Sequence, residues 1–342
     1  MLHLAGYDVS IEQLKNFRQW GSITPGHPEY GVTPGVDAST GPLGHGFAMG
    51  VGFAIAETML AAKYNKPGFE VINHYTYGLT SDGDQMEGVA SEAASLAGTL
   101  GLGKLIYLYD DNHITIEGDT EIAFREDVAN ALKHTAGRYC ALPIPKISTL
   151  WKMPLKKPRP IPNIRALLLY VPISVTAARN RITLPAMRTA WRRSVAKTKE
   201  AADWPVGQSF YVPVTVRKHF DDKLAACAEK QAAWEALLAD YKVVYPELGK
   251  ELEERIKGDV LVSRSDLEAV FNDIEGISTR EAGGEVLQKL SMQLPQLVGG
   301  SADLGPSNKT VMKTCGYYSK DDRTGRNIHF GVREHAMGKA LN

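Results

Sequence analysis

Hydrophobic positions in the first third of the chain alternate between two periodicities. Apolar runs at residues 71–79 and 105–109 have the length and the β-branched and aromatic content of buried strands. Between them, a run of small and acidic residues from residue 85 to about residue 100 favours a helix. This order predicts a βαβ unit, whose parallel strands end at the same edge of one sheet.

Helical spacing returns in residues 200–262, and a further unit begins near residue 277. The first of these regions is predicted to place several apolar residues along one helical stripe, namely Leu224, Cys227, Trp234, Leu237 and Leu238. Residues 278–303 predict a capped helix followed by a strand.

The fold class that follows is α/β with a parallel sheet. We expect a first domain at residues 1–262, a linker at 263–277 and the start of a second domain at 278–342. At 342 residues the chain is long enough for two cores of this size.

Charge is balanced overall but unevenly distributed. The chain has 39 basic and 39 acidic residues, yet residues 128–199 contain 15 Lys and Arg and no acid, which leaves 24 basic against 39 acidic residues elsewhere. A basic segment can serve as a nucleic-acid-binding arm. Because this one lacks the aromatic interleaving of an RNA-binding motif, we expect no nucleic-acid partner.

Other bulk features favour a cytoplasmic protein. Three widely spaced cysteines, Cys140, Cys227 and Cys315, form neither a disulfide framework nor a zinc motif. The first twenty residues do not have the pattern of a signal peptide. We expect no apolar run of membrane-spanning length and therefore no membrane partner.

Candidate chemistry lies where the two strands of the βαβ unit end. Asp82 follows the first strand and Asn112 the second, so their oxygens are predicted to converge at the ligand-binding edge of the sheet. Such hard oxygens suit Mg²⁺ holding a polyphosphate, and the main-chain carbonyl of Ile114 could complete the set. Gly83 would let a phosphate approach the main chain at a helix N-terminus.

These residues resemble a known motif. Ser81-Asp82-Gly83, followed about thirty residues later by Asn112, is similar to the thiamine diphosphate motif of transketolases, in which glycine stands in place of Ser81. The string SITPGHPEYGVTPGVDASTGPLGHGFAMGVGFAIAE at 22–57 also resembles that family. The resemblance implies that His27 lies against the cofactor and that Gly41, Pro42 and Leu43 contribute main-chain contacts.

The last part of the chain resembles the opening of the family's pyrimidine-binding domain, through STREAGGEVLQKLSMQLPQLVGGSADLGPSN at 278–308 and IHFGVREHAMGKA at 328–340. Glu334 matches the glutamate that activates the cofactor through its pyrimidine ring. Glu87 matches an acidic residue that communicates with this glutamate across a dimer interface. The remaining matches lie near cofactor or sugar phosphate: Arg280, Asp303 and Ser307.

The function implied is transfer of a two-carbon ketol unit between sugar phosphates, in a homodimer, with thiamine diphosphate and Mg²⁺ or another divalent cation such as Ca²⁺. A deoxyxylulose phosphate synthase-like enzyme is the alternative within this cofactor class, and phosphoketolase is a more distant one. A different class is a non-catalytic remnant. The resemblance also implies a chain that is incomplete at both ends, so that we expect little activity from it alone.

The acid-free block has a separate explanation. The resemblance fails inside this block. If its codons are read in a shifted frame, each new codon takes the third base of one codon and the first two bases of the next. Read in this way, the block can encode transketolase-like sequences. Residues 133–140 permit AYGWPVL, 143–154 permit DTEDIDALENA, 164–179 permit PSIIIVRTHIGYGSP, and 186–195 permit HANGVAPLG. We therefore interpret about 131–196 as a frame-shifted segment. The last string would restore a histidine that contacts cofactor and substrate in the family.

Overall fold

The structure is a computed structural model that describes residues 1–113, 115–135, 138–141, 167–171, 195–197, 199–200, 202–258, 262–272 and 276–341. It divides into two compact units, of which the first comprises Met1–Gly41 and Ile173–Ala233, and the second Pro42–Pro172 and Trp234–Asn342. The first unit begins with α1 (Ile11–Lys15), which Ser10 caps by accepting a hydrogen bond from the main-chain N–H of Gln13. It also contains the start of α8 (Val214–Val244).

The second unit is built on a four-stranded parallel sheet in the order β1-β2-β4-β3. Its strands are β1 (Thr76–Ser81), β2 (Leu105–Asp110), β3 (Arg138–Ala141) and β4 (Leu167–Val171). The predicted α/β class with parallel strands is confirmed. The first strand begins and ends later than predicted, so that its last residue, Ser81, pairs in register with Asp110 of β2.

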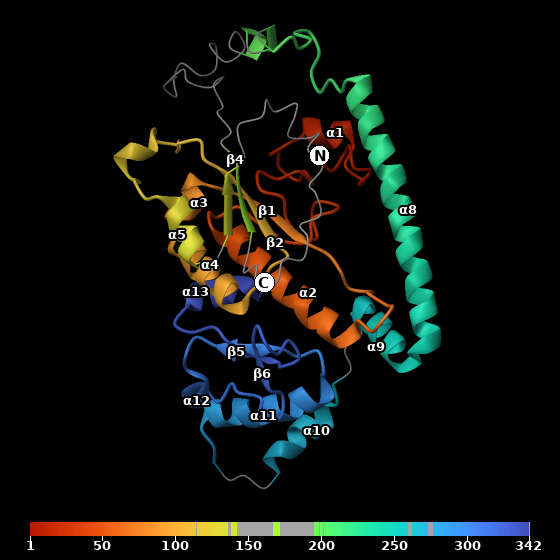
Figure 1. Cartoon of the computed structure of the whole chain (residues 1–342), viewed down its shortest axis with the longest axis vertical. Helices are drawn as coiled ribbons and strands as arrows, with labels where there is room; N and C mark the ends of the chain where they lie inside the picture. The colour runs from red at the N-terminus through yellow and green to blue at the C-terminus, as the bar shows by residue number, and fades with distance from the viewer. Residues whose placement is uncertain are drawn as a thin grey trace. The chain divides into compact units, whose positions relative to one another are not determined.

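Helices α2 (His45–Tyr64), α4 (Gly88–Leu100) and α5 (Val128–Thr135) pack with the sheet, as Figure 1 shows. The single helix expected from residue 85 was wrong, because a short α3 (Asp82–Met86) precedes α4. Glu87 separates them with an extended backbone at ψ 129°, which ends one helix and starts the next. A 3₁₀ turn at Thr120–Ile122 follows β2.

The apolar character of α2 comes from its place in the core. By length and composition alone it could cross a bilayer, contrary to the expectation that no run of this chain reaches that length. In the structure, 44% of its most apolar stretch is buried, and Phe47, Val51 and Ile55 belong to the core that α4 and β2 share. Core helices of folded domains reach the same composition.

A smaller core joins α2 to the end of α8 and to α9 (Pro246–Lys257). Tyr64 and Tyr241 are fully buried there, and Leu237 and Leu238 pack against them. The predicted stripe on α8 is therefore correct in its second half only. Leu224, Cys227 and Trp234 are exposed, although the Trp234 indole N–H donates to the carbonyl oxygen of Val71 at 2.8 Å.

Glu251 on α9 connects this core to α2. It accepts hydrogen bonds from Lys63 at 2.5 Å and from Arg255. Burial opposes ionisation of the Glu251 carboxyl, but the two cations outweigh it and lower its pKa.

Replacing Glu251 with Gln should reduce the pH dependence of stability. A carboxyl with a lowered folded-state pKa stabilises the fold above its unfolded pKa of about 4.5, and that contribution disappears as the pH falls through the folded value. Urea unfolding of both proteins from neutral to acidic pH tests this. Parallel curves for Glu251→Gln and the unmodified chain would contradict it, and Glu247→Gln on the same helix is the control.

The last part of the second unit carries a three-stranded parallel sheet in the order β5-β7-β6. Its strands are β5 (Gly299–Ser301), β6 (Tyr317–Tyr318) and β7 (Asn327–His329). The accompanying helices are α10 (Arg264–Glu268) with a 3₁₀ turn at Ala269–Phe271, α11 (Thr279–Gln293), α12 (Gly305–Asn308) and α13 (Glu334–Ala340). The predicted capped helix and following strand are confirmed as α11 and β5.

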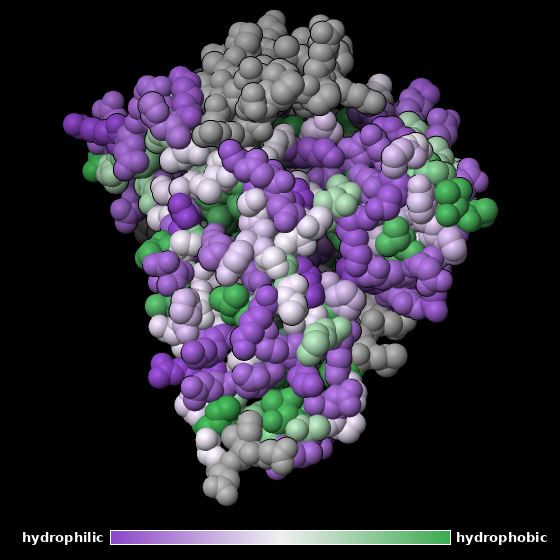
Figure 2. All heavy atoms as spheres, turned by 60° about the horizontal axis from the view of Figure 1, so that its bottom comes forward, coloured by the Kyte–Doolittle hydropathy of each residue, from purple (hydrophilic) through white to green (hydrophobic). Residues whose placement is uncertain are grey.

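Two side chains at the start of β7 fix this sheet. Asn327 is buried and donates to the carbonyl oxygens of Met312 and Gly316. Arg326 donates to the carbonyl oxygens of Ser291 on α11 and of Leu294, which follows that helix. The helix thus lies along the sheet, as in Figure 1. On the face that Figure 2 shows, the coloured surface is largely hydrophilic with scattered hydrophobic residues, which is normal for a folded protein.

Candidate functional site

The ends of β1 and β2 form the candidate site, because the parallel register brings Ser81 beside Asp110. Asp82 begins α3 and is buried, with 2% of its surface exposed. One oxygen of the Asp82 carboxylate accepts a hydrogen bond from the Tyr109 hydroxyl, and the other accepts one from the His113 main-chain N–H at 2.8 Å. The first strand end is thereby joined to the turn that follows the second.

Further acids gather around Asp82. The ligand atoms of Asp82, Asp111 and His113 all lie within 4.8 Å of one another. Asp110 has one buried carboxylate oxygen with no partner among the described residues, and Asn112 donates to the other at 3.0 Å. Burial raises the pKa of Asp110, and the charges of Asp82 and Asp111 raise it further against the hydrogen bond from Asn112.

This donor set fits a divalent cation. Clustered carboxylate oxygens repel one another until a cation neutralises them. A buried oxygen without a hydrogen-bond partner also destabilises the fold, and a bound cation would relieve this. Hard oxygens at this density suit Mg²⁺ or Ca²⁺. Of the predicted ligands, Asp82 is joined to the turn that contains Asn112 through the main-chain N–H of His113, whereas residue 114 lies outside the described residues.

Two of the residues predicted to contact the cofactor, Leu43 and Gly83, are neighbours in the structure. A Cβ atom on Gly83 would lie 3.1 Å from the Leu43 side chain, so the two segments are in close contact. Gly44 follows with φ at 74° and starts α2, a conformation that glycine adopts without strain. Its neighbours include Glu87, whose Cβ would be 3.0 Å from a Cβ at residue 44.

Asp84 holds this arrangement in place. Its carboxylate accepts hydrogen bonds from the main-chain N–H groups of Gly44 at 2.7 Å and Ser81 at 2.9 Å, and from the Ser81 hydroxyl at 3.1 Å. It therefore ties the N-terminus of α2 to the turn after β1. The sequence reading missed Asp84, although Ser81 and Asp84 have the spacing of a helix-capping pair.

Two predicted cofactor residues belong to the first unit. His27 is exposed, and it lies against Gly41, where an added Cβ would be 2.8 Å from the imidazole Cγ. A side chain at residue 41 would therefore displace the His27 ring. The two residues are neighbours within that unit.

The remaining predicted residues lie with the second sheet. Glu334 is the exposed first residue of α13, Arg280 is exposed in the first turn of α11, and Ser307 is exposed on α12. Asp303 is exposed in the turn before α12 with φ at 64°. The structure thus places these four on different elements from the strand ends at Asp82.

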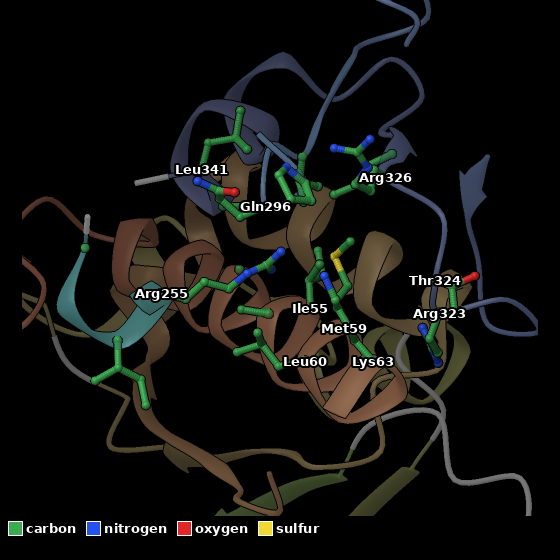
Figure 3. A pocket seen from close by; sticks show the side chains of 18 of the residues that line it. Ile55, Met59, Leu60, Lys63, Arg255, Gln296, Arg323, Thr324, Arg326 and Leu341 are labelled. Atoms are coloured by element: carbon green, nitrogen blue, oxygen red, sulfur yellow. The ribbon is translucent and has the colours of Figure 1, made fainter. Parts of the chain in front are cut away.

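A cavity with a volume of about 740 Å³ lies elsewhere in the second unit. It is bounded by α2, the end of α9, the second sheet and α13, and Figure 3 shows four cations among its lining. Lys63 and Arg255 bind Glu251, while Arg323 and Arg326 donate to main-chain carbonyl oxygens. Since each cation already has a structural partner, we do not assign the functional site to this cavity.

Comparison with known proteins agrees with the geometry. The family described as "Transketolase, thiamine diphosphate binding domain" matches residues 1–139 and 189–261, and "Transketolase, pyrimidine binding domain" matches 275–342. The fold and these matches define the chain as an α/β protein with a thiamine diphosphate-binding domain of the transketolase type. The chain belongs to the transketolase family.

Individual relatives support the same assignment. The chain is 45% identical to a transketolase from Geobacillus stearothermophilus and 44% identical to one from Bacillus subtilis, with all of this chain and 52% of each relative aligned. A solved transketolase variant from Pichia stipitis superimposes with a TM-score of 0.89 at 37% identity, over all of this chain and 52% of that one. The chain spans about half the length of the curated relatives that it matches.

Proposed function

We propose that the chain is the cofactor-binding part of a transketolase, an enzyme that transfers a ketol unit from a ketose phosphate to an aldose phosphate with thiamine diphosphate and a divalent cation. The observation that carries the proposal is buried Asp82, joined through Tyr109 and His113 to the end of the neighbouring strand. Pichia stipitis transketolases with TM-scores of 0.86 to this chain were solved with xylulose 5-phosphate and with sedoheptulose 7-phosphate. These complexes support sugar phosphates as substrates here.

Each half of the proposed site has its own task. Asp82, Asn112 and the carbonyl of Ile114 would hold Mg²⁺ or Ca²⁺, which neutralises the diphosphate. Main-chain groups at Gly41, Leu43 and Gly83, with His27, would line the diphosphate and thiazolium side. The bound cofactor supplies the carbon nucleophile that ketol transfer needs.

The pyrimidine half is proposed to come from a second copy of the chain in a homodimer. There Glu334 would hold a proton against the pyrimidine ring, and Glu87 would face it across the interface. Asp303 would lie near the cofactor, and the exposed Arg280 and Ser307 would bind the sugar phosphate. Free thiols at Cys227 and Cys315 support a cytoplasmic location.

Calorimetric titration of the purified chain with thiamine diphosphate tests the proposal. We expect binding in Mg²⁺ that is lost when EDTA removes the cation. Equal binding in EDTA would contradict the cation role. In a coupled assay with xylulose 5-phosphate and ribose 5-phosphate we expect little or no turnover, because the block at 131–196 lacks the histidine that its shifted frame would restore near residue 186.

The same block supports a second candidate, a non-catalytic remnant. The family match breaks between residues 139 and 189, inside the acid-free segment. Sequencing the gene across codons 128–200 and translating both frames tests the frame change, since DNA unable to encode the four permitted strings would refute it. Robust ketol transfer by the chain as it stands would refute the remnant.

A further inference from the structure

Two histidines from distant parts of the sequence meet beside the strand-end site. His45 is the first residue of α2 and His335 the second residue of α13, and their Nε2 atoms are 3.2 Å apart. The rings are edge to face, with centroids 5.2 Å apart. His45 is half-buried and His335 is exposed, so solvent reaches the pair.

We propose that His45 and His335 together bind a transition-metal cation of the Zn²⁺, Ni²⁺ and Cu²⁺ class. Zn–N bonds of about 2.0–2.1 Å at a tetrahedral angle place two ligand nitrogens about 3.3 Å apart. The observed separation of 3.2 Å fits that geometry. The metal would replace the proton that one Nε2 now shares with the other, and water would complete the coordination.

The two helices hold the pair in place without a metal. Gly52 on α2 lets the carbonyl oxygen of Ala340 approach so closely that an added Cβ would lie 2.0 Å from it. At the start of α13, the main-chain N–H of Ala336 donates to Glu92 of α4 at 2.9 Å. Arg333 donates to the Ser95 hydroxyl at 2.8 Å. Figure 1 shows α13 among these helices, so both imidazoles project from fixed backbone.

Burial and nearby charges act on the His45 imidazole. The groups that act on His45 are His335, Lys339 and Glu87. Burial lowers the pKa of His45, Lys339 and His335 lower it further, and Glu87 opposes them.

One other group among the described residues could compete for the same ions, namely Asp82, Asp111 and His113. Its donors are mostly carboxylate oxygens, which Mg²⁺ also occupies, whereas an imidazole pair has little affinity for Mg²⁺. Excess Mg²⁺ should therefore occupy the carboxylate group and leave Zn²⁺ to the histidine pair. The His113→Gln variant distinguishes the two sites in a second way, because it removes a donor from the carboxylate group only.

The experiment is calorimetric titration of the whole chain with ZnCl₂ in excess Mg²⁺, repeated with NiCl₂. We expect one ion per chain, and an affinity at least about tenfold weaker in both His45→Gln and His335→Gln. His74→Gln, an exposed histidine in the same unit, and His113→Gln should bind as the unmodified chain does. Zn²⁺ should also raise the melting temperature of the unmodified chain but not of His45→Gln.

Three results would overturn the proposal: no Zn²⁺ binding by the unmodified chain, unchanged affinity in either histidine-pair variant, or loss of binding in His113→Gln. Circular dichroism of each variant distinguishes a lost ligand from a lost fold. Since the readout is binding and stability, failure here leaves the ketol-transfer proposal untouched.

Discussion

Asp82→Ala is expected to abolish Mg²⁺-dependent binding of thiamine diphosphate. The substitution removes the one predicted metal ligand that is a carboxylate, and it also releases the Tyr109 hydroxyl and the His113 main-chain N–H from their common acceptor. The turn after β2 would then lose its connection to the turn after β1. Calorimetric titration with thiamine diphosphate in Mg²⁺ should show no heat of binding for this variant.

The matched control is Glu117→Gln, which removes an exposed carboxylate from the same loop. We expect its affinity to equal that of the unmodified chain. Asp82→Asn tests geometry against charge, because it keeps the shape and one acceptor oxygen while removing the negative charge. If Asp82→Ala binds thiamine diphosphate with unchanged affinity and retains a native circular dichroism spectrum, Asp82 is not a ligand of the divalent cation.

Gly52→Ala is expected to destabilise the second unit. Alanine favours a helix interior over glycine by about 1 kcal/mol. Against this, the new Cβ would lie 2.0 Å from the Ala340 carbonyl oxygen, a main-chain atom that cannot turn away. Overpacking of this kind costs about 1–3 kcal/mol or more, so the net change in the free energy of unfolding should be a loss.

Gly338→Ala is the control for Gly52→Ala. Residue 338 lies within α13 itself, and a Cβ there would meet nothing within 4 Å. Only the helix preference then acts, and the variant should be as stable as the parent or up to about 1 kcal/mol more stable. Urea unfolding of both variants gives the comparison. A Gly52→Ala protein as stable as Gly338→Ala would show that α2 and α13 are not in the contact described.

The parts of the site that sequence could predict were those with a local signal. Asp82 and Asn112 each follow an apolar run, and the rule that parallel strands end at one edge brings them together. The break between α3 and α4 at Glu87 has no such signal, because a glutamate at this position is equally compatible with one continuous helix. It depends on Asp84 turning back to Ser81 and Gly44, which only the folded chain reveals.

Contacts between distant segments were the least predictable. The bond from Tyr109 to Asp82 depends on strand register, and the pairing of Glu251 with Lys63 depends on how α9 packs against α2. The stripe on α8 failed in its first half for a related reason. Periodicity identifies an apolar face, but it does not say along how much of its length another element covers that face.

Strand β4 has a consequence at the level of the gene. It pairs with β2 from Leu167 to Val171, in the middle of the segment that we interpret as frame-shifted. When leucine codons TTA or TTG follow one another, the third base of one and the first two bases of the next form ATT or GTT, which encode isoleucine or valine. The shifted string permits IIIV at this position. A strand encoded by such codons therefore remains apolar in both the present and the shifted frame. This frame change therefore leaves a hydrophobic strand apolar, whereas it does not preserve the spaced pattern of an amphipathic helix.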